Sequence, residues 1–408
     1  MRVLWCGAVA FTALLVGWSP PAAAQSNPAS AEPTPAQALA ALRADVQGRA
    51  DHNAYPIQGI HPQDAREVLA GLHSTDRDEW AAAWSAMGQR YADRAKAAET
   101  NHDKATARED WHQAWIHFMF AGWPVQDTPG KRAAYPKSAD AFRHYGALMD
   151  PPLDVVEIPF EGSKIVGLMQ LPKAPRPAPV VISIGGLDEY KEFAVQHFGA
   201  TFLEGGLGEF AIDMPGTGQS PVKAEIGAER MFAKVIDYLR TRSDVDGARI
   251  AVQGVSAGGY WSALLSYVER PRLRAAIVWG GPVHGYFQAD WQRKSFATRE
   301  YLFGLKEARI AIWGFPSEEA FLAGMPKMSL EARGLLSQPS TAVLAVNGQK
   351  DSQVPIDDLY LLLRTGTPKF AWVNPAGGHV GRSADMPEDK IHRQVIVPWL
   401  NQVMAAAQ

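Results

Sequence analysis

The stretch from Ile250 to Tyr260 constrains the fold of this chain more than any other. A short apolar run ends there in the pattern G-x-S-x-G, centred on Ser256, and a helix-compatible segment follows at once. This succession of strand, sharp turn and helix is typical of a nucleophile elbow, which projects a serine hydroxyl from the edge of a sheet. Gly254 and Gly258 leave room for the close backbone approach that such a turn requires. In a chain with 36 glycines the pattern can also arise by chance, so the remaining residues must decide.

Apolar runs alternate with helical patterns through the second half of the chain. Continuous apolar runs are typical of strands buried on both faces of a parallel sheet. The expected strands are Leu153–Glu157, Lys164–Leu171, Pro179–Ile184, Gly208–Ile212, Arg249–Gln253, Leu273–Trp279, Thr341–Val346 and Lys369–Val373. The expected helices between them are Phe193–Leu203, Ile226–Thr241, Tyr260–Val268 and Asp357–Leu363. The first two strands flank the turn signal Glu161-Gly162 and are expected to form a hairpin. The pattern predicts an α/β fold with a doubly wound, mostly parallel sheet across residues 151–408.

Two further regions accompany this sheet. Residues 37–150 have a helical pattern, in which two sets of large side chains recur at helical spacing and predict two antiparallel helices with a tryptophan-rich seam. The sets are Trp80, Trp84, Met87 and Tyr91, then Trp111, Trp115, Phe118 and Gly122. We expect these tryptophans to form core, although they could instead line a pocket. Residues 282–340 form an expected insertion after the sixth strand, with helical pieces at Phe296–Leu305 and Ser317–Leu322.

The N-terminus has the pattern of a secretory signal. Arg2 precedes an apolar stretch at residues 3–18, and Ala22-Ala23-Ala24 fits a cleavage site after Ala24. The apolar stretch is shorter than the about 20 residues that a spanning helix needs, although an uncleaved anchor is the alternative. Residues 25–36, rich in Ala, Pro and Ser, are expected to be a disordered leader. We therefore expect a periplasmic or secreted protein, without stable membrane insertion once residues 1–24 are removed.

Composition excludes several classes of function. The formal net charge of −3, with no Lys/Arg-rich run, gives no reason to expect nucleic acid as a partner. Cys6 is the only cysteine and lies in the signal segment, so the mature chain has no disulfide, cysteine–metal site or cysteine nucleophile. His112 and His117 lack the H-E-x-x-H spacing of a zinc pair and are expected to be packing or surface residues. We expect no metal and no organic cofactor; a homo-oligomer is possible.

Two candidate partners follow Ser256 in the order that such a sheet requires, acid before histidine. Asp351 lies in a turn directly after an expected strand, at the edge where open α/β sheets bind ligands. His379 lies in the glycine-rich loop after the last expected strand. Asp188 and Asp213 are rival carboxylates, but both precede the serine. The order predicts a triad of serine, histidine and aspartate, in which the histidine acts as base and the aspartate orients it.

An acyl-transfer site also needs hydrogen-bond donors for the oxyanion. The backbone N–H of Ala257, directly after the serine, is one expected donor. The second should come from the loop after the third strand, and we expect the N–H of Leu187, with that of Gly186 as the alternative. Five aromatic or histidine side chains near these loops are candidates for the pocket wall, with core packing as the alternative: Tyr190, Tyr260, His284, Tyr286 and Phe287.

With these residues in place, the chain resembles the FrsA-like esterase group of α/β-hydrolases. That group includes 2,6-dihydroxypseudooxynicotine hydrolase and polyketide-shortening hydrolases. The resemblance runs over roughly residues 60–400 and includes residues 157–162 (EIPFEG), residues 185–192 (GGLDEYKE) and His379. It implies a helical N-terminal cap over the site and hydrolysis of an ester, or of a C–C bond next to a carbonyl. The segment after the sixth expected strand has no carboxylate before Asp290, which favours an ester.

The sequence therefore predicts a secreted serine hydrolase that cleaves a carboxylic ester of a small, mostly apolar substrate through an acyl-enzyme. The first alternatives keep the enzyme and change the bond: a C–C hydrolase acting on a β-diketone or acyl-aromatic metabolite, or a peptidase of the prolyl-oligopeptidase kind. The other alternative is a non-catalytic binding protein on the same scaffold. Such proteins usually lose one member of the triad, and this chain has all three.

Overall fold

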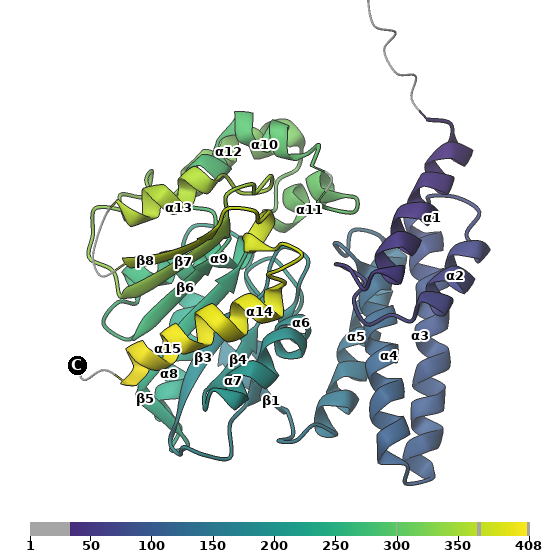
Figure 1. The fold of residues 1–408 in the computed structure, drawn as a ribbon, viewed down its shortest axis with the longest axis horizontal. Helices are drawn as coiled ribbons and strands as arrows, with labels where there is room; N and C mark the ends of the chain where they lie inside the picture. Colours follow the sequence, from purple (N-terminus) through teal and green to yellow (C-terminus); the bar gives the residue numbers. More distant parts are fainter. Residues whose placement is uncertain (1–32, 299, 365–368, 406–408) are drawn as a thin grey trace, which may run out of the picture.

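The computed structural model describes residues 33–298, 300–364 and 369–405 of the 408-residue chain. A single mixed sheet lies at the centre of the larger part, with helices on both faces, and the N-terminal helices stand beside it (Figure 1). The expected signal segment and residues 25–32 of the expected leader lie outside the described residues. The end of that leader is helical, because the first helix, α1, begins at Pro35 with Thr34 as its N-terminal cap.

The sheet has eight strands in the order β1-β2-β4-β3-β5-β6-β7-β8. The β1–β2 and β2–β4 pairs are antiparallel, and all other pairs are parallel. The strands are β1 (Asp154–Phe160), β2 (Ser163–Gln170), β3 (Ala178–Ile184), β4 (Gly208–Ile212), β5 (Val245–Val255), β6 (Ala275–Trp279), β7 (Ala342–Gly348) and β8 (Lys369–Asn374). The predicted sheet, with its antiparallel start and parallel continuation, is confirmed.

The hairpin at the start of the sheet has the predicted two-residue turn. Phe160 pairs with Ser163, and Glu161 and Gly162 between them have φ values of 46° and 77°. Two positive φ values give a turn whose twist matches that of the flanking strands, which is why a glycine is favoured there.

Helices after each crossover cover the two faces of the sheet. They are α6 (Lys191–Ala194), η1 (Val195–Gly199), α7 (Ala200–Glu204), α8 (Arg230–Thr241), α9 (Ala257–Val268), α13 (Ile356–Leu363), η4 (His379–Gly381), α14 (Glu388–Ile391), η5 (His392–Ile396) and α15 (Val397–Ala405). Helix α9 is buried along almost its whole length between the sheet and the insertion. Because it begins directly after β5, its first turn lies at the carboxyl edge of the sheet.

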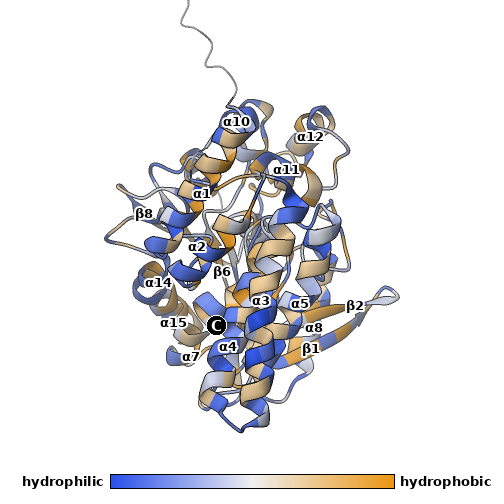
Figure 2. Cartoon of the chain, turned by 90° about the vertical axis from the view of Figure 1, so that its right-hand side faces the viewer, coloured by the Kyte–Doolittle hydropathy of each residue, from blue (hydrophilic) through white to orange (hydrophobic). Residues whose placement is uncertain are grey.

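The N-terminal region consists of α1 (Pro35–Asp51), α2 (Pro62–Gly71), α3 (Arg77–Thr100), α4 (Lys104–Gly122) and α5 (Pro129–Ala147). The expected seam forms between α3 and α4, where the eight residues predicted for it are buried. Trp84 contacts Phe120 with ring centroids 4.8 Å apart, and His117 stacks on Tyr91 at 5.3 Å. Hydrophilic residues recur along α3, on the outer side of the N-terminal helices (Figure 2). The seam is therefore core, as expected.

The insertion differs from its prediction. The expected helix at Phe296–Leu305 is wrong: the structure has α10 (Ala289–Ser295) before it and α11 (Leu305–Ile312) after it. Gly304 has a φ of 72°, a left-handed conformation that ends any right-handed helix, so the new helix can begin only at Leu305. The remaining pieces are η2 (Gly285–Phe287), α12 (Glu318–Gly324) and η3 (Met325–Met328).

One carboxyl group of the sheet is buried without a hydrogen-bond partner among the described residues. Glu209 on β4 is 1% exposed, and neither of its carboxyl oxygens has a hydrogen-bond partner among the described residues. Burial raises the pKa of Glu209 to about 8, although the nearby Ser183 hydroxyl lowers it. The side chain is therefore neutral in the folded protein at pH 7, whereas in the unfolded chain it is ionised.

The raised pKa predicts a loss of stability as the pH rises. Below pH 4.5 both states are protonated at Glu209, and between about pH 4.5 and 8 the unfolded state alone releases its proton. At about 1.4 kcal/mol per pKa unit, we expect the free energy of unfolding to fall by roughly 4 kcal/mol over this range, relative to Glu209→Gln. Urea denaturation of both proteins at several pH values measures the difference. Exposed Glu157 on β1 provides the control Glu157→Gln, and a pH-independent difference for Glu209→Gln would contradict the prediction.

Candidate active site

Ser256 occupies the turn between β5 and α9 with a backbone that few residues adopt. Its φ and ψ are 53° and −121°, and its N–H donates to the carbonyl of Trp279 at 2.7 Å. A Cβ atom on Gly254 would lie 2.1 Å from the carbonyl oxygen of Gly258, and one on Gly258 would lie 2.2 Å from that of Gly185. Only glycine fits at these two positions. The strained turn can therefore form only where the sequence has glycine on both sides of the serine, as in G-x-S-x-G.

Ser256, His379 and Asp351 form one hydrogen-bonded row. The Oγ atom of Ser256 lies 2.8 Å from Nε2 of His379, and Nδ1 of the same ring lies 2.8 Å from Oδ2 of Asp351. The serine follows β5, the aspartate follows β7 and the histidine follows β8, so three loops at one edge of the sheet contribute one residue each. The histidine and the aspartate are 4% and 7% exposed, which shields their contact from water.

The carboxylate in this row is held as an anion. Its second oxygen accepts the backbone N–H groups of Gln353 at 2.8 Å and Val354 at 2.9 Å. Burial alone raises the pKa of Asp351, but the charge and hydrogen bond of His379, together with the Val354 N–H, hold the pKa below its usual value. An ionised, fixed acceptor beside Nδ1 favours the tautomer whose Nε2 can accept a proton.

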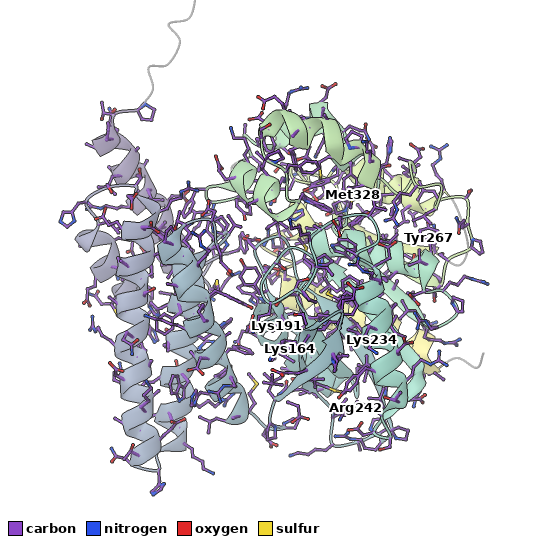
Figure 3. All side chains as sticks on the ribbon, turned by 180° about the vertical axis from the view of Figure 1, so that it is seen from behind. Lys164, Lys191, Lys234, Arg242, Tyr267 and Met328 are labelled. Carbon is purple, nitrogen blue, oxygen red and sulfur yellow. The ribbon has the colours of Figure 1, made fainter. Side chains whose placement is uncertain are left out.

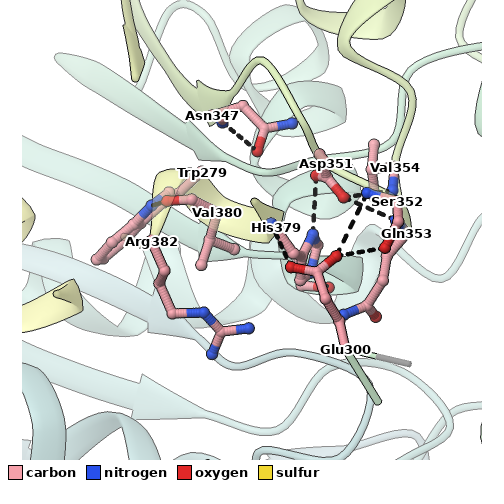
Figure 4. Close-up of polar contacts among 12 residues, drawn as sticks. Trp279, Glu300, Asn347, Asp351, Ser352, Gln353, Val354, His379, Val380 and Arg382 are labelled. Atoms are coloured by element: carbon pink, nitrogen blue, oxygen red, sulfur yellow. Dashed lines mark hydrogen bonds and ion pairs between the residues drawn. The ribbon is translucent and has the colours of Figure 1, made fainter. Parts of the chain in front are cut away.

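Glu300, which no sequence pattern singled out, holds the loop of His379 in place. Its Oε1 accepts the backbone N–H of His379 at 2.9 Å, and its Oε2 accepts the N–H and hydroxyl of Ser352 (Figure 4). One carboxylate of the insertion thus ties the loop of the histidine to the loop of Asp351.

The expected oxyanion donors lie beside the serine. Ala257 is the first residue of α9, so its N–H has no acceptor within the helix. Gly186 lies against Ser256, since a Cβ on it would be 3.5 Å from the serine Cβ. Its N–H interacts with the carboxyl group of Glu189, which leaves the N–H of Leu187 as the better candidate in this loop.

A narrow cavity of about 30 Å³ lies above Ser256, with space for about two water molecules. Leu187, Ala257 and His379 line it, and so does Tyr286, one of the five residues expected for the pocket wall. The other four are absent from its described lining. Tyr260 and Phe287 are fully buried against each other, His284 bonds Ser329 and Glu331 in the insertion, and Tyr190 packs on Tyr135.

Several cavity residues come from positions that the sequence did not single out. Asp188, considered only as a rival acid, accepts hydrogen bonds from the indole of Trp123 at 2.5 Å and from the hydroxyl of Tyr55. Burial raises the pKa of Asp188, against the effect of these donors. The remaining unpredicted residues of the lining include Glu189, Tyr301, Arg309, Arg382 and Glu388.

The loop that carries Leu187 is anchored by a buried lysine. Nζ of Lys191, 1% exposed, contacts Oδ2 of Asp213 at 2.8 Å, Oε1 of Glu192 at 3.0 Å and the hydroxyl of Tyr135 at 3.0 Å. Lys191 lies on the side of the sheet domain that faces the N-terminal helices (Figure 3). Asp213, considered in the sequence as a rival acid, belongs to this anchor. The loop after β3, the loop after β4 and helix α5 therefore meet at one ammonium group.

Two other features are absent from the described part of the chain. No group of three or more His, Cys, Asp or Glu side chains there is arranged to hold a metal ion. Within the same ranges, no helix combines the length and apolar character that crossing a bilayer requires.

Comparison with solved structures defines the class of this protein. The structure of 2,6-dihydroxy-pseudo-oxynicotine hydrolase is similar with a TM-score of 0.71 and 21% identity, over 85% of this chain and 94% of that chain. AbyA5 is similar with a TM-score of 0.64 and 18% identity, over 83% and 90%. Together with the sheet order, these similarities identify the fold as that of the α/β-hydrolases.

The family follows from the sequence comparison. Residues 57–367 match the model of the esterase FrsA-like family, and the chain belongs to that family. Curated relatives include Esterase FrsA of Vibrio vulnificus (strain YJ016), 25% identical over 74% of this chain and 76% of the relative. Esterase FrsA of Salmonella enteritidis PT4 (strain P125109) is 26% identical over 84% and 85%. The predicted family is confirmed, and the protein is a hydrolase from a family of esterases.

The backbone strain at Ser256 predicts an unusual order of stability. A non-glycine residue with positive φ and extended ψ costs about 1–3 kcal/mol, which glycine avoids. Glycine in turn loses more entropy on folding, by about 0.5–1 kcal/mol. We expect Ser256→Gly to be more stable than Ser256→Ala by about 1 kcal/mol in urea denaturation. The same pair at helical Ser262 should show the opposite order, and an alanine variant at Ser256 that is the more stable would refute the argument.

Proposed function

We propose that the protein is a serine hydrolase that cleaves a carboxylic ester through the triad Ser256, His379 and Asp351. The observation that carries this proposal is the hydrogen-bonded row itself, with both contacts at 2.8 Å. A hydroxyl, an imidazole and a buried carboxylate in that order supply a nucleophile, a base and a group that stabilises the charged base.

The reaction proceeds in two halves. His379 takes the proton of the Ser256 hydroxyl, and the oxygen attacks the acyl carbon of the ester. The N–H groups of Ala257 and Leu187 hold the oxyanion, and the protonated imidazole then passes its proton to the departing alcohol. Water repeats the sequence on the acyl-enzyme, with His379 again as base, and releases the acid. Asp351 stays ionised throughout and stabilises the imidazolium. These steps use side chains and backbone of this chain alone.

The walls of the cavity support a small and mostly apolar ester. Three of its lining residues are tyrosines, Tyr55, Tyr286 and Tyr301, and five more are Leu or Val. An aromatic and aliphatic lining favours a compact organic molecule over an extended peptide. Because the cavity holds only about two water molecules, even a short ester must widen it on entry.

Substitution of the triad tests the proposal. We expect Ser256→Ala, His379→Gln and Asp351→Asn each to lower kcat on p-nitrophenyl esters at least about 1,000-fold, because each removes an element of one coupled unit. A fluorophosphonate should label the folded protein at Ser256 and fail to label Ser256→Ala. Ser337, exposed in the insertion, provides the control Ser337→Ala, which should keep both properties.

Two outcomes would contradict the proposal. Folded protein that is not labelled by the fluorophosphonate would favour a binding protein on a hydrolase scaffold. Faster turnover of an acyl-phenol diketone than of p-nitrophenyl esters would favour hydrolysis of a C–C bond.

We also propose that the enzyme is exported, on the charge, apolar stretch and alanine triplet of residues 2–24. Expression of the full chain in a Gram-negative host should yield periplasmic protein whose N-terminal residue is Gln25, read by mass spectrometry. Replacement of Ala22 and Ala24 by arginine should block this cleavage. Cytoplasmic protein that still carries Arg2 would exclude export.

A further inference from the structure

Arg309 differs from the other fully buried cations of this protein. Among the described residues, three lysine and arginine side chains are 2% exposed or less: Lys131, Lys191 and Arg309. Lys191 has two carboxylate partners, and Lys131 has Asp127 at 3.9 Å. Within the described ranges, Arg309 makes no ion pair. A guanidinium is always charged, and burying a charge without a counter-ion destabilises the folded protein. The burial of Arg309 therefore needs an explanation.

Neutral groups hold the Arg309 side chain in place. Its Nη1 donates to Oε1 of Gln292 at 2.8 Å and to Oγ of Ser295 at 2.6 Å, and its Nη2 approaches the carbonyl of Gln353 at 3.5 Å. The guanidinium carbon lies 4.8 Å from the ring centroid of Tyr286. These contacts orient the group without neutralising it.

Arg309 also belongs to the wall of the candidate active site. Arg309 lines the cavity that also contains Ser256 and His379, and its partners Tyr286 and Gln353 line that cavity too. It belongs to α11, the helix of the insertion that lies nearest to the N-terminal helices (Figure 1). A fixed positive charge therefore borders the space that a substrate must occupy.

The acidic groups of the cavity are accounted for by other partners. Glu388 pairs with Arg382 at 2.9 Å. Asp188 accepts hydrogen bonds from Trp123 and Tyr55. Burial, with the charges of Glu388 and Asp188, raises the pKa of Glu189 well above its usual value, which favours its neutral form. Arg309 is thus the cation of the lining that no carboxylate of the described residues neutralises.

We infer that Arg309 binds a carboxylate of the substrate, so that the preferred esters are those that carry a free carboxylate in addition to the scissile bond. The inference rests on the proposed function and narrows its substrate class. A planar guanidinium held by Gln292 and Ser295 can offer N–H groups to a carboxylate oxygen, and such charge-assisted bonds are the stronger class of hydrogen bond. An ester with this group remains apolar elsewhere, as the tyrosine walls require.

Two matched pairs of esters test the inference, one for each side of the scissile bond. Monomethyl adipate and dimethyl adipate differ by a carboxylate on the acyl side, and 4-acetoxybenzoate and methyl 4-acetoxybenzoate differ by one on the leaving group. We expect kcat/KM to be at least about tenfold higher for the acid member of one pair. In Arg309→Gln this ratio should fall at least about tenfold. Exposed Arg293, on α10 of the same insertion and paired with Asp290, provides the control Arg293→Gln, which should keep the ratio.

Calorimetry with adipate and benzoate separates this inference from the proposed function, because binding needs no catalysis. Ser256→Ala should still bind one of these carboxylates, and Ser256→Ala/Arg309→Gln should not. If wild-type protein hydrolyses neither pair but Ser256→Ala binds a carboxylate through Arg309, the proposed function fails and the inference stands. A wild-type preference for the neutral member of both pairs would overturn the inference without any variant. An unchanged ratio in Arg309→Gln, or a parallel loss on both members, would overturn it as well.

Discussion

The position of the Ser256 hydroxyl depends on a backbone conformation that is unfavourable on its own and is held by contacts between loops. The turn after β5 stays in its strained geometry because Gly254 and Gly258 let its own backbone and the loop after β3 approach within van der Waals contact. Ala257 and Leu187, whose amides are the proposed oxyanion donors, line the same cavity as Ser256. A change in this backbone packing would therefore displace the proposed nucleophile and the proposed donors together.

The insertion after β6 contacts the loops that carry His379 and Asp351. Glu300 links the His379 loop to Ser352, and Arg309 reaches the carbonyl of Gln353 beside the Asp351 loop. Glu300 therefore joins the loops of His379 and Asp351, and Arg309 contacts the second of these loops. Under the proposed function, sequence changes in the insertion that break these contacts should disturb the triad as well as the choice of substrate.

Much of this architecture could be predicted from the sequence, because strands, elbow and triad order are encoded locally. The fully apolar strand β6 and the G-x-S-x-G turn have patterns that few other structures satisfy. The cavity wall could not be predicted in this way. Tyr55 and Arg309 of this wall, and Trp123, which bonds the lining residue Asp188, belong to helices or loops. Their placement against the sheet is decided by packing between distant segments. Tyr260 was misplaced for a related reason: it is near Ser256 in sequence, but in α9 its side chain turns away toward Phe287 and Trp313. The helix expected at Phe296–Leu305 failed because hydrophobic spacing does not reveal the backbone at Gly304.

The buried ammonium of Lys191 joins the N-terminal helices to the sheet domain. Among the partners that the described residues provide, Tyr135 is the one from outside the sheet domain. A shortened chain that begins after α5 would lack Tyr135 and Trp123, so Lys191 and Asp188 would each lose a hydrogen-bond partner. The surface against which Trp123 packs would be exposed to solvent. The N-terminal helices and the sheet domain therefore depend on each other. Recombination between relatives near residue 150 would combine the helices of one protein with the Lys191 site of another, to which they are not matched.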